Sequence, residues 1–199
     1  MTAVDISRPL SSKGRQTRRS LEDAARKLFA ERGFHRTTLA DITAAAGRSP
    51  ASFYRYFTDK EDLLAVLAES FLREVVDLPK IPDDNDFFVA AVGLYWDRFK
   101  PNIGIMVAVD QLAAANSRFA LLQKRFRKFG TDIVGVSVRR AKQQGYAAEL
   151  DADHIALAIA LLFERFTSVS VSEGLSDAAA VSTLSTIWQK TLYGQSTTE

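Results

Sequence analysis

The sequence contains no cysteine among its 199 residues, which excludes disulfide bonds, thiolate metal sites and a cysteine nucleophile together. Its first dozen residues lack the apolar centre of a secretory signal, and no stretch reaches about 18 consecutive apolar residues. These absences indicate neither export nor a membrane span. We therefore expect a cytoplasmic protein with no membrane partner.

Groups suited to catalysis are scarce as well. Only two histidines occur, His35 and His154, and neither accompanies a nucleophile in a recognisable pattern. Asp151, Asp153 and His154 crowd the start of one predicted helix, where acidic residues interact favourably with the helix dipole, so a metal site is the less favoured interpretation. We expect a protein that is not an enzyme, with no catalytic residue, no metal and no cofactor.

The net charge of +2 is unevenly distributed along the chain. Residues 1 to 60 carry 12 Lys and Arg against 6 Asp and Glu, a net of +6, whereas the remaining residues carry 14 against 18, a net of −4. This pattern is typical of a basic N-terminal module that meets a polyanion, joined to a mildly acidic body that does not. Chance clustering on solvated helix faces would give the same numbers, so charge alone leaves both interpretations open.

Apolar residues recur at helical spacing along the whole chain, and no strand-like alternation competes with them. Segment 77–86 has two prolines and four aspartates, which predicts a loop and the boundary between two modules. Gly130 and Gly135 each cost a long helix about 1 kcal/mol, which favours a bend or break in its middle. The sequence thus predicts an all-α protein of nine helices, near residues 15–33, 38–47, 49–57, 58–75, 85–100, 102–115, 117–144, 152–172 and 177–193.

Two very short predicted helices flank Gly47. Thr38 with Asp41 predicts a capping box for the first of them, and Thr58 with Glu61 predicts another for the helix that follows the pair. A short helix, a tight turn and a second short helix are the parts of a helix-turn-helix, whose second helix lies in the major groove of DNA. Plain packing of two helices uses the same pattern, but Arg, Ser and Tyr cluster where the second helix begins, and these residues reach phosphates and base edges.

The stretch GFHRTTLADITAAAGRSPASFYRYFTDKEDLL combines several specific features. They are the pair Gly33-Phe34, the pair Thr37-Thr38, the turn Ala46-Gly47, the Phe-Tyr-x-Tyr-Phe block and Lys60-Glu61. With them, residues 15 to 64 resemble the N-terminal DNA-binding region of the tetracycline-repressor (TetR) family of bacterial transcriptional regulators, whose fold is all-helical. The chain departs from the family pattern at Arg48, Pro50 and Ala51, which leaves its base specificity open.

The resemblance implies three regions: a flexible tail over 1–12, a helix-turn-helix DNA-binding domain over 13–60, and a ligand-binding and dimerisation domain over 61–199. It also implies binding to double-stranded DNA with a palindromic operator, with Thr38 offering its N–H and hydroxyl to a phosphate and Arg48 reading a guanine. The implied DNA-binding residues are Thr38, Arg48, Ser49, Ser52, Tyr54, Arg55, Tyr56 and Lys60. A basic arm of Lys13, Arg15, Arg18 and Arg19 reaches the DNA backbone or is a solvated tail; both interpretations stay open.

Residues after the predicted loop suit two further roles. Helical DNA readers bind two half-sites, which requires a homodimer, and the resemblance implies that the last two helices form its interface. We expect that interface to contain Ile155, Ile159, Leu162, Phe166, Val181, Leu184 and Trp188. The resemblance also implies a cavity for a small apolar or aromatic effector, for which we expect Tyr95, Trp96, Phe99, Met106, Asp110, Phe126 and Phe163. Asp110 is the expected polar group, and a filled aromatic core is the alternative.

The function predicted from these features is a ligand-responsive, sequence-specific transcriptional regulator, most often a repressor that an effector releases from its operator. Two alternatives on the same fold remain: a DNA-binding protein that has no effector, and a protein-interaction module that has lost DNA binding.

Overall fold

The structure is a computed structural model that describes residues 11–76, 86–147, 149 and 151–194. The predicted tail, up to residue 10, and nearly all of the predicted loop, residues 77–85, lie outside the described residues. Within them the chain is helical, without a strand, which confirms the all-α prediction. The elements are α1 (Ser12–Arg32), α2 (Leu39–Ala45), α3 (Pro50–Phe53), α4 (Lys60–Val76), α5 (Phe87–Phe99), the 3-10 turn η1 (Lys100–Asn102), α6 (Ile103–Ala113), α7 (Ser117–Gln143), α8 (Ala152–Glu173) and α9 (Asp177–Tyr193).

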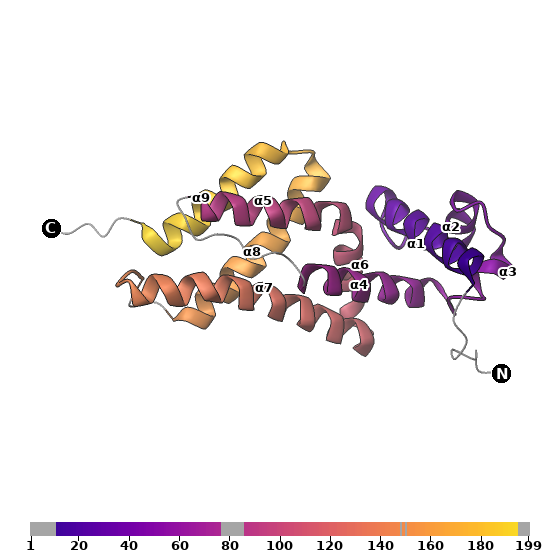
Figure 1. The fold of residues 1–199 in the computed structure, drawn as a ribbon, viewed down its shortest axis with the longest axis horizontal. Coiled ribbons are helices and arrows are strands. Elements are labelled where there is room, and N and C mark those ends of the chain that lie inside the picture. Colours follow the sequence, from indigo (N-terminus) through magenta and orange to yellow (C-terminus); the bar gives the residue numbers. More distant parts are fainter. Residues whose placement is uncertain (1–10, 77–85, 148, 150, 195–199) are drawn as a thin grey trace.

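The helices α1, α2 and α3 lie together at one end of an elongated molecule, and α9 lies toward the other end (Figure 1). Between these ends α4 packs against α1, α6 and α7, so it connects the N-terminal helices to the body. In the body α7 packs along α8, and α5 packs against α9. The N-terminal helices therefore contact the body mainly through α4 and α6.

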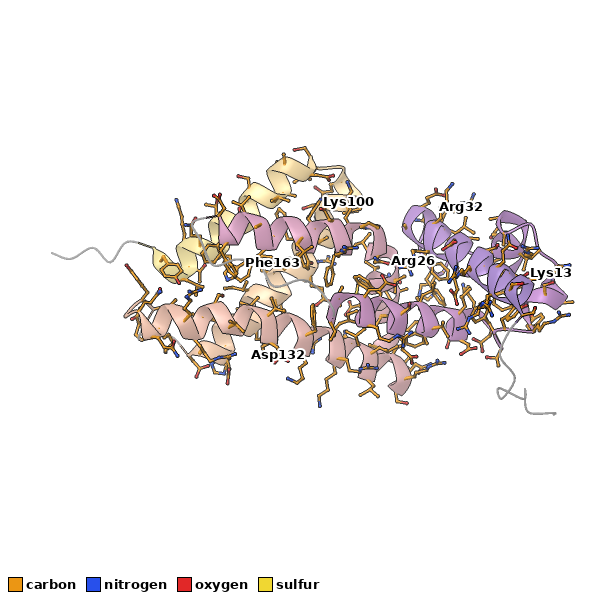
Figure 2. All side chains as sticks on the ribbon, viewed as in Figure 1. Lys13, Arg26, Arg32, Lys100, Asp132 and Phe163 are labelled. Carbon is orange, nitrogen blue, oxygen red and sulfur yellow. The ribbon has the colours of Figure 1, made fainter. Side chains whose placement is uncertain are left out.

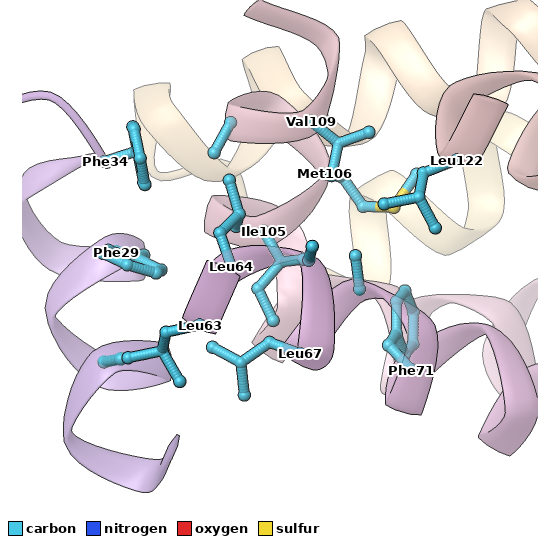
Figure 3. Packing of buried hydrophobic residues seen from close by; sticks show 14 of the residues in the cluster. Phe29, Phe34, Leu63, Leu64, Leu67, Phe71, Ile105, Met106, Val109 and Leu122 are labelled. Carbon is cyan, nitrogen blue, oxygen red and sulfur yellow. The ribbon is translucent and has the colours of Figure 1, made fainter. Parts of the chain in front are cut away.

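One apolar core joins the N-terminal helices to the body. In it, α4 contributes Leu63, Leu64 and Leu67, which lie between the phenylalanines near α1 and the apolar side chains of α6 (Figure 3). Phe71 continues this core toward α7, stacking edge-on against Phe99 at the end of α5. Burial of these large side chains stabilises the arrangement by about 1.5–3 kcal/mol each.

A second core lies at the far end of the body, among α5, α7, α8 and α9. Trp188 on α9 is buried there between Phe88 and Phe163, at ring-centroid distances of 5.2 and 5.6 Å. Its indole Nε1 donates a hydrogen bond to Ser137 Oγ at 3.1 Å, so the polar edge of the ring is satisfied inside the core.

The body meets α1 at the corner between α5 and α6. Arg26, on the side of α1 that faces the body (Figure 2), donates a hydrogen bond to Asn102 Oδ1 at this corner. Asn102 Nδ2 in turn donates to Arg98 O at 2.8 Å. Next to it, Gly104 lies directly against the backbone of α1: a Cβ added to Gly104 would lie 2.4 Å from the carbonyl carbon of Phe29. A glycine at this position therefore permits the two helices to approach closely.

Three local predictions are wrong. α7 continues unbroken past Gly130, where a glycine instead lets α7 approach α8 closely, because an added Cβ would lie 3.3 Å from Ala160 Cβ. The capping box of Thr58 with Glu61 does not form; Asp59 Oδ1 accepts from the backbone N–H of Asp62 at 2.7 Å instead, since α4 begins later than predicted.

The third is the interpretation of the basic arm as a solvated tail, because its residues belong to α1; their contact with the DNA backbone stays a prediction. α1 begins one residue after its N-cap Ser11, which accepts a hydrogen bond from the backbone N–H of Gly14. Within α1, Arg18 pairs with Glu22 at 2.8 Å and lies over the Phe57 ring, so it stabilises the module.

Candidate nucleic-acid interface and ligand cavity

The backbone of residues 38 to 53 forms two short helices joined by a tight turn. Gly47 has φ +61°, a left-handed conformation that side chains disfavour, and this explains the glycine in the turn. After it, the backbone N–H of Arg48 donates to Thr43 O at 2.8 Å. Ser49 then caps α3, because its hydroxyl accepts from the backbone N–H of Ser52 at 3.2 Å.

The capping box predicted at the start of α2 is confirmed. Thr38 Oγ1 accepts from the backbone N–H of Asp41 at 3.1 Å, and Asp41 Oδ2 accepts from the backbone N–H of Thr38 at 2.8 Å. The Thr38 hydroxyl also donates to Asp41 Oδ2 at 2.6 Å. This bond contributes most to holding the pKa of Asp41 below its ordinary value, and the bond from the backbone N–H of Thr38 contributes next. The N–H that Thr38 was expected to offer to a phosphate is therefore already bound, and its phosphate contact stays a prediction.

The structure gathers the predicted DNA-binding residues at the free end of the N-terminal module. Thr38, Ser49, Tyr54 and Arg55 are exposed, and the Tyr54 side chain is 58% exposed although its residue type usually packs more deeply. Half-buried positions are taken by Arg48, Ser52, Tyr56 and Lys60. Beneath them, the Phe53 and Phe57 rings pack together with centroids 5.4 Å apart, so the surface rests on a rigid aromatic base.

Arg48 lies in an unusual environment in this group. It follows the turn glycine directly, and its Nε is buried without a hydrogen-bond partner in the described part of the chain. A guanidinium stays charged at any physiological pH, so a half-buried one with an unused donor can gain an acceptor from outside the protein.

Lys60 is bound by the protein itself. Its Nζ donates to Phe34 O and to Thr37 O, both at 2.8 Å, and lies 4.1 Å from the centroid of the Phe34 ring. Partial burial lowers the pKa of Lys60. These contacts fix the loop between α1 and α2 to the start of α4, and its predicted phosphate contact would compete with them.

A cavity of about 1030 Å³ runs through the body, between α5, α7, α8 and α9. Its lining is mostly aromatic and aliphatic, and it extends along α7 from Phe126 to Gln144. The exposed side chains of Val76, Ile133 and Val136 belong to the lining, so the cavity reaches the surface beside α4 and α7. The aromatic region thus contains an open site rather than a completely filled core.

Five of the residues expected at an effector site line this cavity: Tyr95, Phe99, Met106, Phe126 and Phe163. Tyr95 is buried, and its hydroxyl forms a hydrogen bond of 3.1 Å with Thr167 Oγ1, while burial raises the pKa of Tyr95.

Two expected residues do not line the cavity. Trp96 is buried in the second core, since its position on α5 is one residue, and therefore about 100°, away from Tyr95. Asp110 is exposed and accepts a hydrogen bond from Gln123 Nε2, because it lies on the outer face of α6. The expectation that Asp110 orients a ligand is wrong.

The polar groups of the cavity were missed from the sequence. They include Arg127 on α7, Glu164 on α8, and Arg140 with Gln144 near the end of α7. A signal for Glu164 exists, since it is the only carboxylate within the apolar run IALAIALLFERF, residues 155 to 166. Arg127 gives no such signal, because it stands beside Arg125 and Lys128 in a basic stretch.

The expected dimer residues fall into two groups. Ile159, Leu184 and Trp188 are buried inside the protomer, where they pack in the second core, so the expectation that they face a partner is wrong. The other four, Ile155, Leu162, Phe166 and Val181, keep part of their surface accessible.

An exposed apolar strip on α8 and α9, which we call the α8–α9 strip, comprises Leu161, Leu162 and Ile187. By length and mean hydropathy α8 is also long and apolar enough to cross a membrane, and it is the only such helix in the described residues. Some of the apolar side chains of α8 are buried against α7 and α9, and others belong to the exposed α8–α9 strip.

The Asp151, Asp153 and His154 group caps a helix. Asp151 Oδ1 accepts from the backbone N–H groups of Asp153 and His154, at 3.1 and 2.9 Å, and these bonds lower the pKa of Asp151. Among the described residues, no three His, Asp or Glu side chains lie together in a way that could hold a metal ion.

Comparisons with known proteins agree with this geometry. Residues 21–67 match the family of bacterial regulatory proteins described as the tetR family. The transcriptional regulator EthR of Mycobacterium tuberculosis is 24% identical, over 98% of this chain and 99% of the relative. A transcriptional regulator from Saccharomonospora viridis, solved with choline, superposes with a TM-score of 0.71 at 21% identity, over 89% of this chain and 96% of that one. FadR from Bacillus subtilis, solved with stearoyl-CoA, superposes with a TM-score of 0.67 at 16% identity, over 89% of this chain and 98% of that one.

Proposed function

Because this chain belongs to the TetR family of bacterial transcriptional regulators, which bind DNA through a helix-turn-helix, we propose that it is a ligand-responsive repressor. In this proposal residues 13–60 bind a palindromic operator in the cytoplasm, and residues 61–199 bind an effector and dimerise. The observation that carries the DNA-binding role is the surface around the turn, where exposed Tyr54 and Arg55 adjoin Arg48 with its unpartnered Nε.

We assign recognition of a specific base to Arg48, and placement of the protein on the DNA to the residues around it. Arg48 donates in bidentate fashion to a guanine, and Ser49, Ser52 and Arg55 contact neighbouring bases or phosphates. Loss of one bidentate contact costs about 1–3 kcal/mol and relaxes the preference for that base.

Two half-sites require two copies of the chain, and the α8–α9 strip supports a homodimer. Leu161, Leu162 and Ile187 expose apolar surface on adjacent helices, which a second copy related by two-fold symmetry would cover. In such a dimer the two α3 helices lie about 34 Å apart, or a multiple of it, to match successive turns of DNA.

The cavity supports regulation by an effector. Its 1030 Å³ is at the upper end of the range for small-molecule sites, and the lining residues Phe99 and Met106 stand on either side of the corner that contacts α1. At this corner Asn102 binds Arg26 and Gly104 abuts Phe29. A ligand that separates Phe99 from Met106 therefore displaces α1, and with it the helix-turn-helix, which lowers the affinity for the operator.

Selection of bound DNA from a random pool tests the DNA-binding role. We expect a two-fold symmetric site for the unaltered protein, and for Arg48→Ala a loss of affinity of about 5- to 150-fold with relaxed preference at one base pair per half-site. Arg73→Ala, which removes an exposed arginine from the end of α4, is the matched control and keeps both affinity and preference. Enrichment of no site, or a symmetric site read equally by Arg48→Ala, would refute this assignment.

The effector role has its own test. Ligands from an apolar panel that raise the melting temperature are added to the protein–operator complex, and fluorescence anisotropy of the DNA reports release. Leu94→Trp fills part of the cavity from α5, and we expect it to bind the operator but to resist release; Val89→Trp, exposed on the same helix, is the control. Ligands that stabilise the protein but never change its DNA affinity would favour a DNA-binding protein without an effector.

A further inference from the structure

Two charged side chains line the cavity, and each lies within reach of the other's charge. Arg127 on α7 and Glu164 on α8 both line the cavity, and neither side chain forms a hydrogen bond or ion pair with any described residue. The Nε of Arg127 is buried although nothing accepts from it. Buried polar groups are paired in the great majority of cases, so this pair marks a position where a ligand completes the bonding.

The two charges differ in how they can respond to burial. Burial raises the pKa of Glu164 and the negative charge of Asp110 raises it further, whereas the positive charge of Arg127 lowers it. The guanidinium of Arg127 keeps its charge, since arginine is not deprotonated in proteins at physiological pH. The donor that lacks an acceptor at this place is the buried Nε of Arg127.

The shape of the cavity limits the rest of the ligand. It extends along α7 from Phe126 to Gln144, which corresponds to roughly 27 Å at about 1.5 Å per helical residue. Arg127 lies near the end that Met106 also lines, and Trp188 lines the cavity farther along. The wall between them is apolar, so a long or flat apolar body fits there.

We propose that the effector is an elongated amphiphile with a carboxylate head, which Arg127 binds through its Nε and a terminal nitrogen while the apolar body extends along α7 toward Trp188. The inference rests on the proposed function only in taking this cavity as the effector site. Bound in this way, the head group supplies the acceptor that the buried Nε of Arg127 lacks.

A cationic head fits less well. It would pair with Glu164 but would leave Arg127 without an acceptor and add a second positive charge beside it. Arg140 also lines the cavity, but it stands 13 residues, or roughly 20 Å, farther along α7, so it cannot bind the same head group as Arg127.

Direct binding of three matched probes tests the proposal without DNA. Dodecanoate, its methyl ester and dodecylamine share one chain length, and each is used below the concentration at which it forms micelles. Binding is followed by calorimetry and by tryptophan fluorescence, which senses the cavity through Trp188 in its lining. We expect dodecanoate to bind about 10- to 150-fold more tightly than the ester and the amine, the range for one hydrogen-bonded charged group. Lengthening the acid should strengthen binding by about fourfold per methylene until the cavity is full.

Variants locate the head group. In Arg127→Met the preference for the acid over the ester disappears, while Lys124→Met, an exposed cation on the same helix, retains it. Glu164→Gln removes the negative charge from the cavity and retains the preference, whereas a cation site would lose affinity. Arg127→Lys retains part of the preference, which keeps the test decisive should Arg127→Met fail to fold.

Three results would overturn the inference. One is tighter binding of the amine than of the acid, a second is a preference that survives Arg127→Met, and the third is a preference lost in Arg140→Met instead. Each of these leaves the effector role of the cavity intact, because the probe still binds. Failure of all three probes overturns the carboxylate assignment, whereas the effector role is decided separately by the operator-release experiment with the wider panel.

Discussion

Replacing Gly104 by alanine is the sharpest test of how the body meets the N-terminal helices. The added Cβ would lie 2.4 Å from the carbonyl carbon of Phe29 and 2.5 Å from the backbone nitrogen of Ala30, whereas ordinary contacts begin at 3.4 Å. Backbone atoms cannot rotate away as a side chain can, so α1 and α6 must separate by about 1 Å, a strain of the kind that costs about 1–3 kcal/mol.

The expected magnitude combines two opposing effects. Alanine gains up to about 1 kcal/mol over glycine in a helix, and the clash with backbone lies at the upper end of the overpacking range, about 3 kcal/mol. We therefore expect Gly104→Ala to lower the free energy of unfolding by about 2 kcal/mol. Gly93→Ala on α5 is the matched control, since nothing lies within 4 Å of its added Cβ, and it should raise stability by up to about 1 kcal/mol.

Urea unfolding followed by circular dichroism measures both variants, at one protein concentration because dimerisation shifts the apparent stability. The reasoning is refuted if Gly104→Ala is as stable as the unaltered protein, or if the two alanine variants change stability in the same direction. Either result would show that α1 and α6 are not in backbone contact, and the route proposed from the cavity to the helix-turn-helix would fail with it.

Three further predictions concern other parts of the chain. Lys60→Met removes two hydrogen bonds to backbone carbonyls and should lower the free energy of unfolding by about 2 kcal/mol in urea titrations. The pKa of Asp41 in the folded protein lies below its ordinary 3.8, so Asp41 stabilises the fold fully above pH 3.8 and loses this effect as the pH falls through the folded pKa. Thr38→Ala removes the main cause of the lowered pKa. We therefore expect the free energy of unfolding of this variant, measured from pH 6 to pH 2.5, to depend less steeply on pH. Leu162→Glu on the α8–α9 strip should convert a dimer into a monomer in sedimentation experiments, whereas Leu121→Glu, exposed on α7, should leave the dimer unchanged.

Local signals predicted most of the helices. The apolar spacing of α1, α7 and α9 fixed their positions to within a few residues, and the capping box of Thr38 with Asp41 marked the start of α2. The predicted cap at Thr58 failed because several residues in the stretch TDKED can cap, and the sequence does not say which of them the tertiary structure will use.

The faces of the helices were harder to predict. Leu184 and Trp188 were assigned to a partner surface because they are apolar and regularly spaced, but a core and an interface produce the same spacing. Asp110 was assigned to the cavity because it interrupts an apolar segment, yet a single polar residue in such a segment also marks the solvent side of a helix.

By itself the sequence determined that the chain is helical, that the turn at Gly47 separates two short helices, and that basic and aromatic residues surround this turn, since each of these depends on residues close together along the chain. Only the tertiary structure decided that Arg127 and Glu164 line one cavity, and that Gly104 meets the backbone of α1. Those features arise between residues tens of positions apart, whose contacts depend on how helices pack and not on the spacing within any one of them.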